Sequence, residues 1–214
     1  GNIFGNMSNS NHTYDFTTAL LDNVYSLIGY TFKGWSKSPK GTVDYKNGEK
    51  VSNLTNENGD VVNLYAVWEA NTYTVRYNDN KPSGTSNTVS GSISDSIFTY
   101  DEMSSLNKNN YFIIGYTFKG WATSKNGTVV YSDNQTVRNL TSVDGGIVEL
   151  YAVWEANEYS ITFDNMGGSF ANKMLIKYDE AFLEIIPPTR KGYNFEGYYT
   201  LPNGEGVKYY NNDG

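Results

Sequence analysis

Short runs in which apolar and polar residues alternate, separated by polar turns, dominate this chain. Residues 73–77 (YTVRY) alternate and are rich in β-forming side chains, so they predict a strand. Residues 92–100 predict a second strand, and residues 111–123 predict a third. Residues 148–155 (VELYAVWE) carry apolar side chains on both faces, which is typical of a central strand. The pattern therefore predicts a small sheet.

One stretch of the same region has helical spacing. Residues 101–107 place Met103 and Leu106 three positions apart, which predicts a short helix with both side chains facing inward. Residues 15–21 fit the same interpretation. Because a sheet face must be covered by another element, we expect this helix to pack against the sheet.

The third strand contains a break in its alternation. Phe118 and Trp121 are three positions apart, so plain alternation would send them to opposite faces. Gly120 lies between them, and a β-bulge there would turn Trp121 back toward the core.

The same strand sequences occur twice at one constant offset. The string GYTFKGW fills residues 29–35 and returns at residues 115–121, which is 86 positions later. The string LYAVWEAN fills residues 64–71 and returns at residues 150–157, again 86 positions later. A single offset shared by separate strings indicates a duplicated structural unit.

A third unit begins at Tyr159, where YSITFDN corresponds to YTVRYND. Its GYNFEGY string starts at Gly192, nine positions earlier than the offset requires. We therefore divide the chain into a first module (1–71) without its first strand, a complete second module (72–157) and a third module (158–214) without its last strand. We expect the chain to be part of a longer array.

Composition narrows the classes of function. The 214 residues include 19 Tyr and 21 Gly, a usage typical of short strands joined by polar turns. Cysteine is absent, which excludes disulfides and cysteine-ligated zinc. The net charge of −7 argues against binding to nucleic acid, and no run of about 18 apolar residues could cross a bilayer.

Candidate catalytic groups are not kept between modules. His12 is the only histidine, and Phe98 stands at its counterpart in the second module. The acidic pair Asp101 and Glu102 could resemble a glycosidase pair, but the counterpart of Glu102 is Phe16. We therefore expect these residues to be structural, and we expect no enzymatic activity and no cofactor.

Two further patterns invite a chemical interpretation. The loops at Asp79 and Asp164 could suggest calcium binding, but they lack the terminal bidentate glutamate, so turn chemistry explains them better. Lys33 and Lys119 could form an intramolecular isopeptide bond, but the third module has Glu196 at this position, which argues against it.

Several motifs in order resemble a known family. The third module has YSITFDNMGGSF (159–170), MLIKY (174–178) and PPTRKGYNFEGYYT (187–200), and the earlier modules have GYTFKGW followed by LYAVW. Together they resemble the Listeria–Bacteroides repeat, the family that includes the B repeat of listerial internalins. The resemblance implies an α+β, strand-dominated fold of tandem β-grasp (ubiquitin-like) modules. It also implies an extracellular location in bacterial surface or secreted proteins, and it carries no catalytic residues.

Two functions remain open. In the first, the modules form a non-catalytic stalk or spacer, and the short Glu-Ala-Asn links (69–71 and 155–157) hold neighbouring modules in contact. In the second, the modules bind a host surface protein or a glycan directly, through a sheet edge or a row of exposed aromatics. The candidate aromatic residues, which could instead pack on the sheet or across module joints, are Tyr30, Tyr65, Tyr116 and Tyr151.

Overall fold

Strands account for almost all the regular structure of this chain. The computed structural model describes residues 2–169 and 173–214, and these residues form several small sheets with a single short 3-10 turn. Their contacts divide the chain into two compact units. The first unit is residues 1–80, 92–110 and 120–152, and the second is residues 81–91, 111–119 and 153–214.

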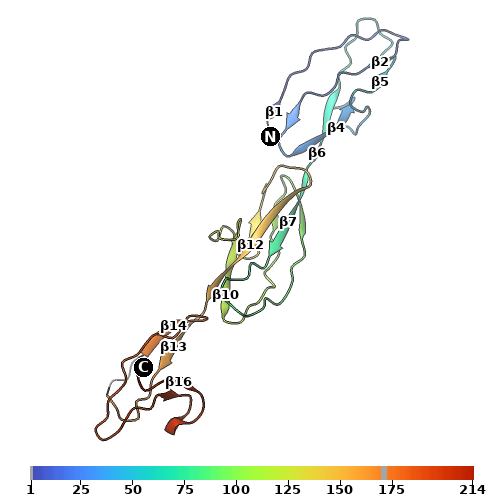
Figure 1. Cartoon of the computed structure of the whole chain (residues 1–214). Helices are drawn as coiled ribbons and strands as arrows, with labels where there is room; N and C mark the ends of the chain where they lie inside the picture. Colours follow the sequence, from blue (N-terminus) through green and yellow to red (C-terminus); the bar gives the residue numbers. More distant parts are fainter. Residues whose placement is uncertain (1, 170–172) are drawn as a thin grey trace. The chain divides into compact units, whose positions relative to one another are not determined.

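The second module contains the largest sheet (Figure 1). Its strands are β7 (Thr72–Asn78), β8 (Ser96–Thr99), β9 (Ser104–Ser105), β10 (Tyr116–Ala122), β11 (Thr136–Val137) and β12 (Gly146–Ala156). The order in the sheet is β10-β12-β7-β8, with β12 parallel to β7 and β8 antiparallel to it. The prediction that residues 148–155 form a central strand is therefore confirmed.

The core of the second module follows from this order. β7 alternates strictly, so Tyr73, Val75 and Tyr77 are all buried on one face. Leu150 of β12 and Trp121 of β10 are fully buried beside them. The sheet therefore buries the apolar face that the sequence pattern assigns to it.

Over residues 2–70 the first module forms three two-stranded sheets. Its strands are β1 (Ile3–Phe4), β2 (Thr18–Ala19), β3 (Ser26–Leu27), β4 (Tyr30–Ser36), β5 (Lys50–Val51) and β6 (Tyr65–Ala70). β4 pairs with β6, and the register shifts between Phe32 and Gly34. Gly34 is the counterpart of Gly120, where the sequence predicts a bulge, and the two glycines have nearly the same φ, +149° and +144°. Trp35 is thereby turned into a core cluster with Leu20 and Val51.

The described residues of the third module form four strands. These are β13 (Glu158–Thr162), β14 (Lys173–Lys177), β15 (Tyr198–Tyr199) and β16 (Lys208–Tyr210), with the 3-10 turn η1 at Pro202–Gly204. β13 pairs with β14, and β15 pairs with β16, both antiparallel. Phe163, Ile176 and Tyr210 are its buried apolar residues.

The predicted helices at residues 15–21 and 101–107 are wrong. Asp101 has a φ of +66°, and the chain then forms β9, which pairs with β11; in the first module β2 pairs with β5 in the same way. Leu106 is buried as expected, but Met103 is 72% exposed. A helix of two turns is marginal on its own, so the pairing available from a distant strand decides the conformation.

Candidate functional site at the joints between modules

A single residue separates the last strand of the first module from the first strand of the second. β6 ends at Ala70 and β7 begins at Thr72, so Asn71 is the whole connection. The Asn71 amide donates to the Gly29 carbonyl at 2.8 Å, and the Asn71 carbonyl accepts from the Tyr100 amide at 2.8 Å. This residue therefore joins the backbone of the first module to that of the second.

Gly29 and Tyr100 form the packing contact of this joint. Gly29 has a φ of +78°, a conformation that glycine adopts readily. A Cβ on Gly29 would lie 2.2 Å from the ring of Tyr100, so only glycine leaves room for that ring. The ring of Tyr30 meets Tyr100 edge-on, with centroids 6.0 Å apart, a favourable arrangement for an aromatic pair.

A polar cluster surrounds the hydroxyl of Tyr30. This hydroxyl donates to Oδ2 of Asp101 at 3.0 Å. The other oxygen of Asp101 accepts from the side-chain amide of Asn139 at 2.8 Å and from Arg138 at 3.0 Å. The backbone amide of Asp101 donates to Oδ1 of Asn139 at 2.6 Å, so the carboxylate and the positive-φ turn are held together.

The hydrogen bonds of this cluster favour an ionised Asp101. Donation from Asn139, and then from Tyr30, holds the pKa of the Asp101 carboxyl below its ordinary value. The hydrogen bond to Asp101 in turn raises the pKa of the Tyr30 phenol. At neutral pH the joint therefore pairs a neutral phenol with a carboxylate.

The same arrangement recurs at the second boundary. Gly115 has a φ of +82°, and a Cβ there would lie 2.2 Å from the ring of Tyr178. The hydroxyl of Tyr116 donates to Asp179 at 3.1 Å, and the rings of Tyr116 and Tyr178 are 6.0 Å apart. Asn157 again links the backbone, donating to the Gly115 carbonyl at 2.8 Å and accepting from the Tyr178 amide at 2.9 Å.

The first and third modules each also contain half of a joint. In the first module Asp15 also has a positive φ and exchanges two hydrogen bonds with Asn53, while Tyr14 is 57% exposed. In the third module Gly192 has a φ of +80°, and a Cβ there would meet nothing within 4 Å. The backbone next to Tyr14 and at Gly192 thus has the same conformation as the backbone of the two complete joints.

A family model confirms the tandem repetition. The model of the Listeria-Bacteroides repeat domain matches the chain three times, over residues 2–67, 73–153 and 159–214. The chain belongs to this family.

Three relatives extend the comparison. The chain is 31% identical over 175 residues to a protein of Evansella cellulosilytica described as a Gly-rich membrane protein, and 30% identical over 176 residues to another described as a membrane protein. Each match covers 80% of the chain, but only 18% and 23% of those proteins. Internalin H of Listeria monocytogenes is 33% identical over 93 residues, which is 42% of the chain and 15% of that protein. The chain therefore spans less than a quarter of each relative, and no solved structure matches it significantly.

The four aromatic candidates lie in two different settings within these Listeria-Bacteroides repeats. Tyr30 and Tyr116 are the hydroxyl donors of the two joints. Tyr65 stands at the start of β6, opposite Ser36 of β4, and is 38% exposed. Tyr151 is half-buried in β12. The structure therefore brings Tyr30 and Tyr116 to the joints and leaves Tyr65 and Tyr151 on the strands.

Sequence reasoning missed the acceptor side of the joints. The local pattern presents Tyr100 only as the end of the second predicted strand, Asp101 only as the start of a helix, and Tyr178 only as the end of the MLIKY segment (174–178). A signal was available, because the dipeptide Tyr-Asp stands at 14–15, 100–101 and 178–179. Each of the three Asp residues has a positive φ, between +63° and +66°.

The other candidate groups have structural contacts. His12 is half-buried, and its ring nitrogen lies 2.9 Å from the hydroxyl of Ser10. The side-chain amide of Asn165 donates to the Ser169 carbonyl at 2.8 Å, which is turn chemistry, whereas that of Asn80 donates to the Ala152 carbonyl of β12 at 2.8 Å. Within residues 2–169 and 173–214 no cluster of metal-binding side chains occurs, and no helix could span a membrane.

Proposed function

We propose that this chain is a non-catalytic spacer from a bacterial cell-envelope protein, in which Listeria-Bacteroides repeats are held in fixed succession by Gly-Tyr/Tyr-Asp joints. The observation that carries the proposal is the recurrence of one joint at both boundaries. Asn71 and Asn157 stand 86 positions apart, but Tyr100 and Tyr178, whose amides donate to them and whose rings pack on the joint glycines, stand only 78 apart. The joint is thus kept although the third module is shorter.

The contacts of the joint suit a stiff connection. With one connecting residue, neither module can rotate without breaking the two backbone hydrogen bonds of Asn71 or Asn157. The ring of Tyr100 or Tyr178 fills the space beside the glycine, so the packing is specific to one orientation. A spacer needs both the restricted rotation and the single orientation, because its function is to span a distance.

A β-grasp architecture for each repeat is part of this proposal. Its support is the sheet of the second module, in which the first strand, β7, and the last, β12, are parallel neighbours at the centre. β8 and β10 flank them, as in a β-grasp sheet. The extended segment around β9 and Leu106 stands where such a fold has its helix, and Leu106, 1% exposed, fills the core from that side.

The proposed location rests on the relatives. Two are described as membrane proteins and the third is Internalin H. We therefore place the chain in a bacterial cell envelope, on the outer side or secreted, where a chain without cysteine has no disulfide to form.

Small-angle X-ray scattering would test the spacer proposal. The full chain should behave as an elongated particle with a narrow distribution of dimensions, and inserting three glycines after Asn71 should broaden that distribution. Circular dichroism of the insertion variant controls for folding of the modules. A compact particle for the native chain, or an insertion without effect, would contradict the proposal.

Direct adhesion to a host protein or a glycan is the second candidate. The exposed side chain of Tyr65 on β6 favours it, since aromatic faces stack on sugars and anchor protein interfaces. A glycan array probed with the native chain and with a Tyr65→Ala, Tyr151→Ala variant would test it. Loss of a signal in the variant would support adhesion, and absence of any signal with the native chain would count against glycan binding.

A further inference from the structure

Two equivalent strands of the second and third modules form open sheet edges. β8 (Ser96–Thr99) is the outermost strand in the order β10-β12-β7-β8, and β14 (Lys173–Lys177) pairs only with β13 among the described strands. Each pairs antiparallel with the first strand of its own module. Because the second module is complete and β8 is still unpaired on one side, this position is an outer edge of the repeat itself.

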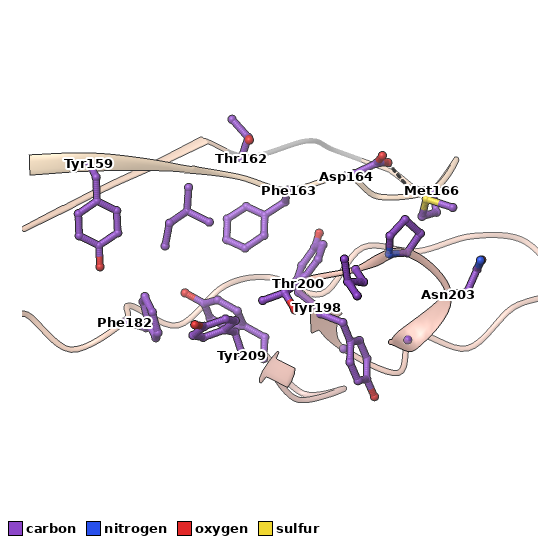
Figure 2. Close-up of a pocket in the computed structure, with 17 residues that line it drawn as sticks. Tyr159, Thr162, Phe163, Asp164, Met166, Phe182, Tyr198, Thr200, Asn203 and Tyr209 are labelled. Atoms are coloured by element: carbon purple, nitrogen blue, oxygen red, sulfur yellow. Dashed lines mark hydrogen bonds between the residues drawn. The ribbon is translucent and has the colours of Figure 1, made fainter. Parts of the chain in front are cut away.

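The edge of β14 is separate from the cavity of the third module. That cavity, of about 630 Å³, is lined mainly by β13 and by the segment 197–210. Figure 2 shows Tyr159 and Phe163 on one wall and Tyr198 and Tyr209 on the other. Among the described residues, none of β14 lines it. The exposure of β14 is therefore a property of its own edge.

Both edges carry an exposed aliphatic side chain at the same position. Ile97 of β8 is 76% exposed and Leu175 of β14 is 66% exposed. Each stands three positions before the tyrosine of a joint, so the two are equivalent. The residues that follow them, Phe98 and Ile176, are buried, so Ile97 and Leu175 lie on the face of the sheet turned away from the core.

The backbone at these two positions also points outward. The amides of Tyr100 and Tyr178 donate to the carbonyls of the linker asparagines directly opposite them. Hydrogen-bonded pairs alternate from there along an antiparallel ladder. Ile97 and Leu175 stand three positions earlier, so their N–H and C=O groups point to the open edge. Each edge thus offers a donor and an acceptor to an added strand.

A carboxylate borders the edge of β8. Asp95, the residue before this strand, lies 3.2 Å from the guanidinium of Arg76, and Glu149 contacts the same guanidinium at 3.2 Å. Two carboxylates therefore share one cation, and the side chain of Asp95 is 41% exposed. This corner of the sheet favours a further cation.

Lysines border the edge of β14. Lys173 and Lys177 begin and end the strand, each two residues from Leu175 and on the same outer face. The side chain of Lys177 is 49% exposed and lies 3.8 Å from Glu158 of β13. The edge of β14 therefore favours an anionic neighbour, which is the charge found beside β8.

An antiparallel pairing of β8 with β14 of a second copy would bring these features together. The opposed residues would be Ile97 and Leu175, Asp95 and Lys177, and Thr99 and Lys173. Apolar pairs and opposite charges that face each other directly stabilise paired strands. Two β14 strands paired on Leu175 would instead set lysine against lysine, and two β8 strands would oppose no opposite charges.

We propose that β8 of one copy of this chain pairs antiparallel with β14 of a second copy, so that copies associate edge to edge. The contact is heterologous, because the two edges differ, and each copy keeps one edge open for a further copy. Edges of four and five residues make a small contact, so the association is weak and reversible.

Sedimentation velocity of the full chain over a range of concentrations tests the proposal, and NMR locates the contact. The native chain should self-associate, and the amides of Ile97 and Leu175 should shift together as its concentration rises. Asp95→Lys and Lys177→Glu should each weaken association roughly fivefold to tenfold, because each sets like charges opposite each other. An equimolar mixture of these two variants should recover the native affinity, because the two changed side chains are again opposite in charge.

Ile97→Lys tests the edge itself, and Ile147→Lys is its matched control. Ile147 is also exposed, at 53%, and lies in the same row of the outer face, but it belongs to the central strand β12. Ile97→Lys should abolish association and Ile147→Lys should not change it, with circular dichroism confirming that both variants fold. Loss of association in Ile147→Lys would assign the contact to the sheet face and overturn the proposal. A native chain that stays monomeric up to about 1 mM, or a charge-swapped mixture that does not associate, would also overturn it.

Discussion

The joint between the second and third modules makes a quantitative prediction about one glycine. Gly115→Ala should open this joint while leaving both modules folded. The introduced Cβ would lie 2.2 Å from the ring of Tyr178, a distance that forces the ring to move. Gly192→Ala is the matched control, because Gly192 has nearly the same φ, +80° against +82°, but no atom within 4 Å of its Cβ position.

The magnitude follows from what each variant loses. Both alanines occupy a left-handed backbone conformation, which costs about 1–2 kcal/mol in either variant. Only Gly115→Ala also displaces Tyr178, which loses its edge contact with Tyr116, worth about 0.5–1.5 kcal/mol. It also weakens the Asn157 to Gly115 backbone bond, worth about 1 kcal/mol. The joint-specific loss is therefore about 2 kcal/mol.

Amide hydrogen exchange measured by NMR would report this loss at two sites. The amides of Asn157 and Tyr178 both donate across the joint. In Gly115→Ala they should exchange roughly 30-fold faster than in the native chain, by the conversion of about 2 kcal/mol. In Gly192→Ala their exchange should not change. Equal acceleration in the two variants, or none at Tyr178, would show that the ring contact does not hold the joint.

Three further predictions concern the core, the phenols and the surface charges. Trp121→Ala should destabilise the second module by about 3–5 kcal/mol in urea unfolding, because Trp121 is fully buried, and a loss below 1 kcal/mol would contradict this packing. Burial, and then the hydrogen bond to Asp179, raises the pKa of the Tyr116 phenol. The neutral phenol therefore stabilises the fold in full below the ordinary phenol pKa of about 10, and this stabilisation is lost as the pH rises through the folded-state pKa. The melting temperature should fall in that pH range, and Tyr116→Phe should reduce the fall. Lys119→Met should leave the melting temperature unchanged, because the ion pair of Lys119 with Glu155 is exposed. NMR titration of this variant should nevertheless show the pKa of Glu155 rising toward its ordinary value, since the hydrogen bond from Lys119 is the main cause that lowers this pKa.

The strands were predictable to different degrees. β7 and β12 were identified because strict alternation and two-sided apolarity are local properties of the sequence. The second predicted strand, 92–100, shortens to β8, since only Ser96–Thr99 pairs with β7. β9 was mistaken for a helix because its partner, β11, lies some 30 residues later, and no local pattern encodes that pairing.

The joints were only half predictable. Tyr30 and Tyr116 were selected because they recur, and packing across module joints was one of their two interpretations. Their partners were missed because Tyr30 and Asp101 are 71 residues apart in the sequence. The spacing from the linker asparagine to the Tyr-Asp dipeptide also differs between modules, so a search at the constant offset passes over Tyr178.

The stretch between the linker asparagine and the tyrosine that follows it is shorter in the third module than in the second. Asn71 and Tyr100 are 29 positions apart, whereas Asn157 and Tyr178 are 21 apart, so the third module has eight fewer residues between the linker asparagine and the joint tyrosine. In the second module this stretch contains the loop 81–91, which belongs to the compact unit of the third module.

That loop braces the joint that follows it. The side-chain amide of Asn87 donates to the Tyr178 hydroxyl at 3.0 Å and to the Ile114 carbonyl at 3.2 Å. It therefore ties the ring of Tyr178 to the residues that precede β10, next to Gly115. In the third module the described part of the shorter loop contacts its own module, since Asn165 accepts from the Tyr198 hydroxyl and the Ser169 amide donates to the Thr189 carbonyl at 2.8 Å. The long loop thus serves the next joint rather than its own sheet. Asn87→Ala should accordingly accelerate exchange at Tyr178 and leave β7 protected, and accelerated exchange in β7 would contradict this assignment.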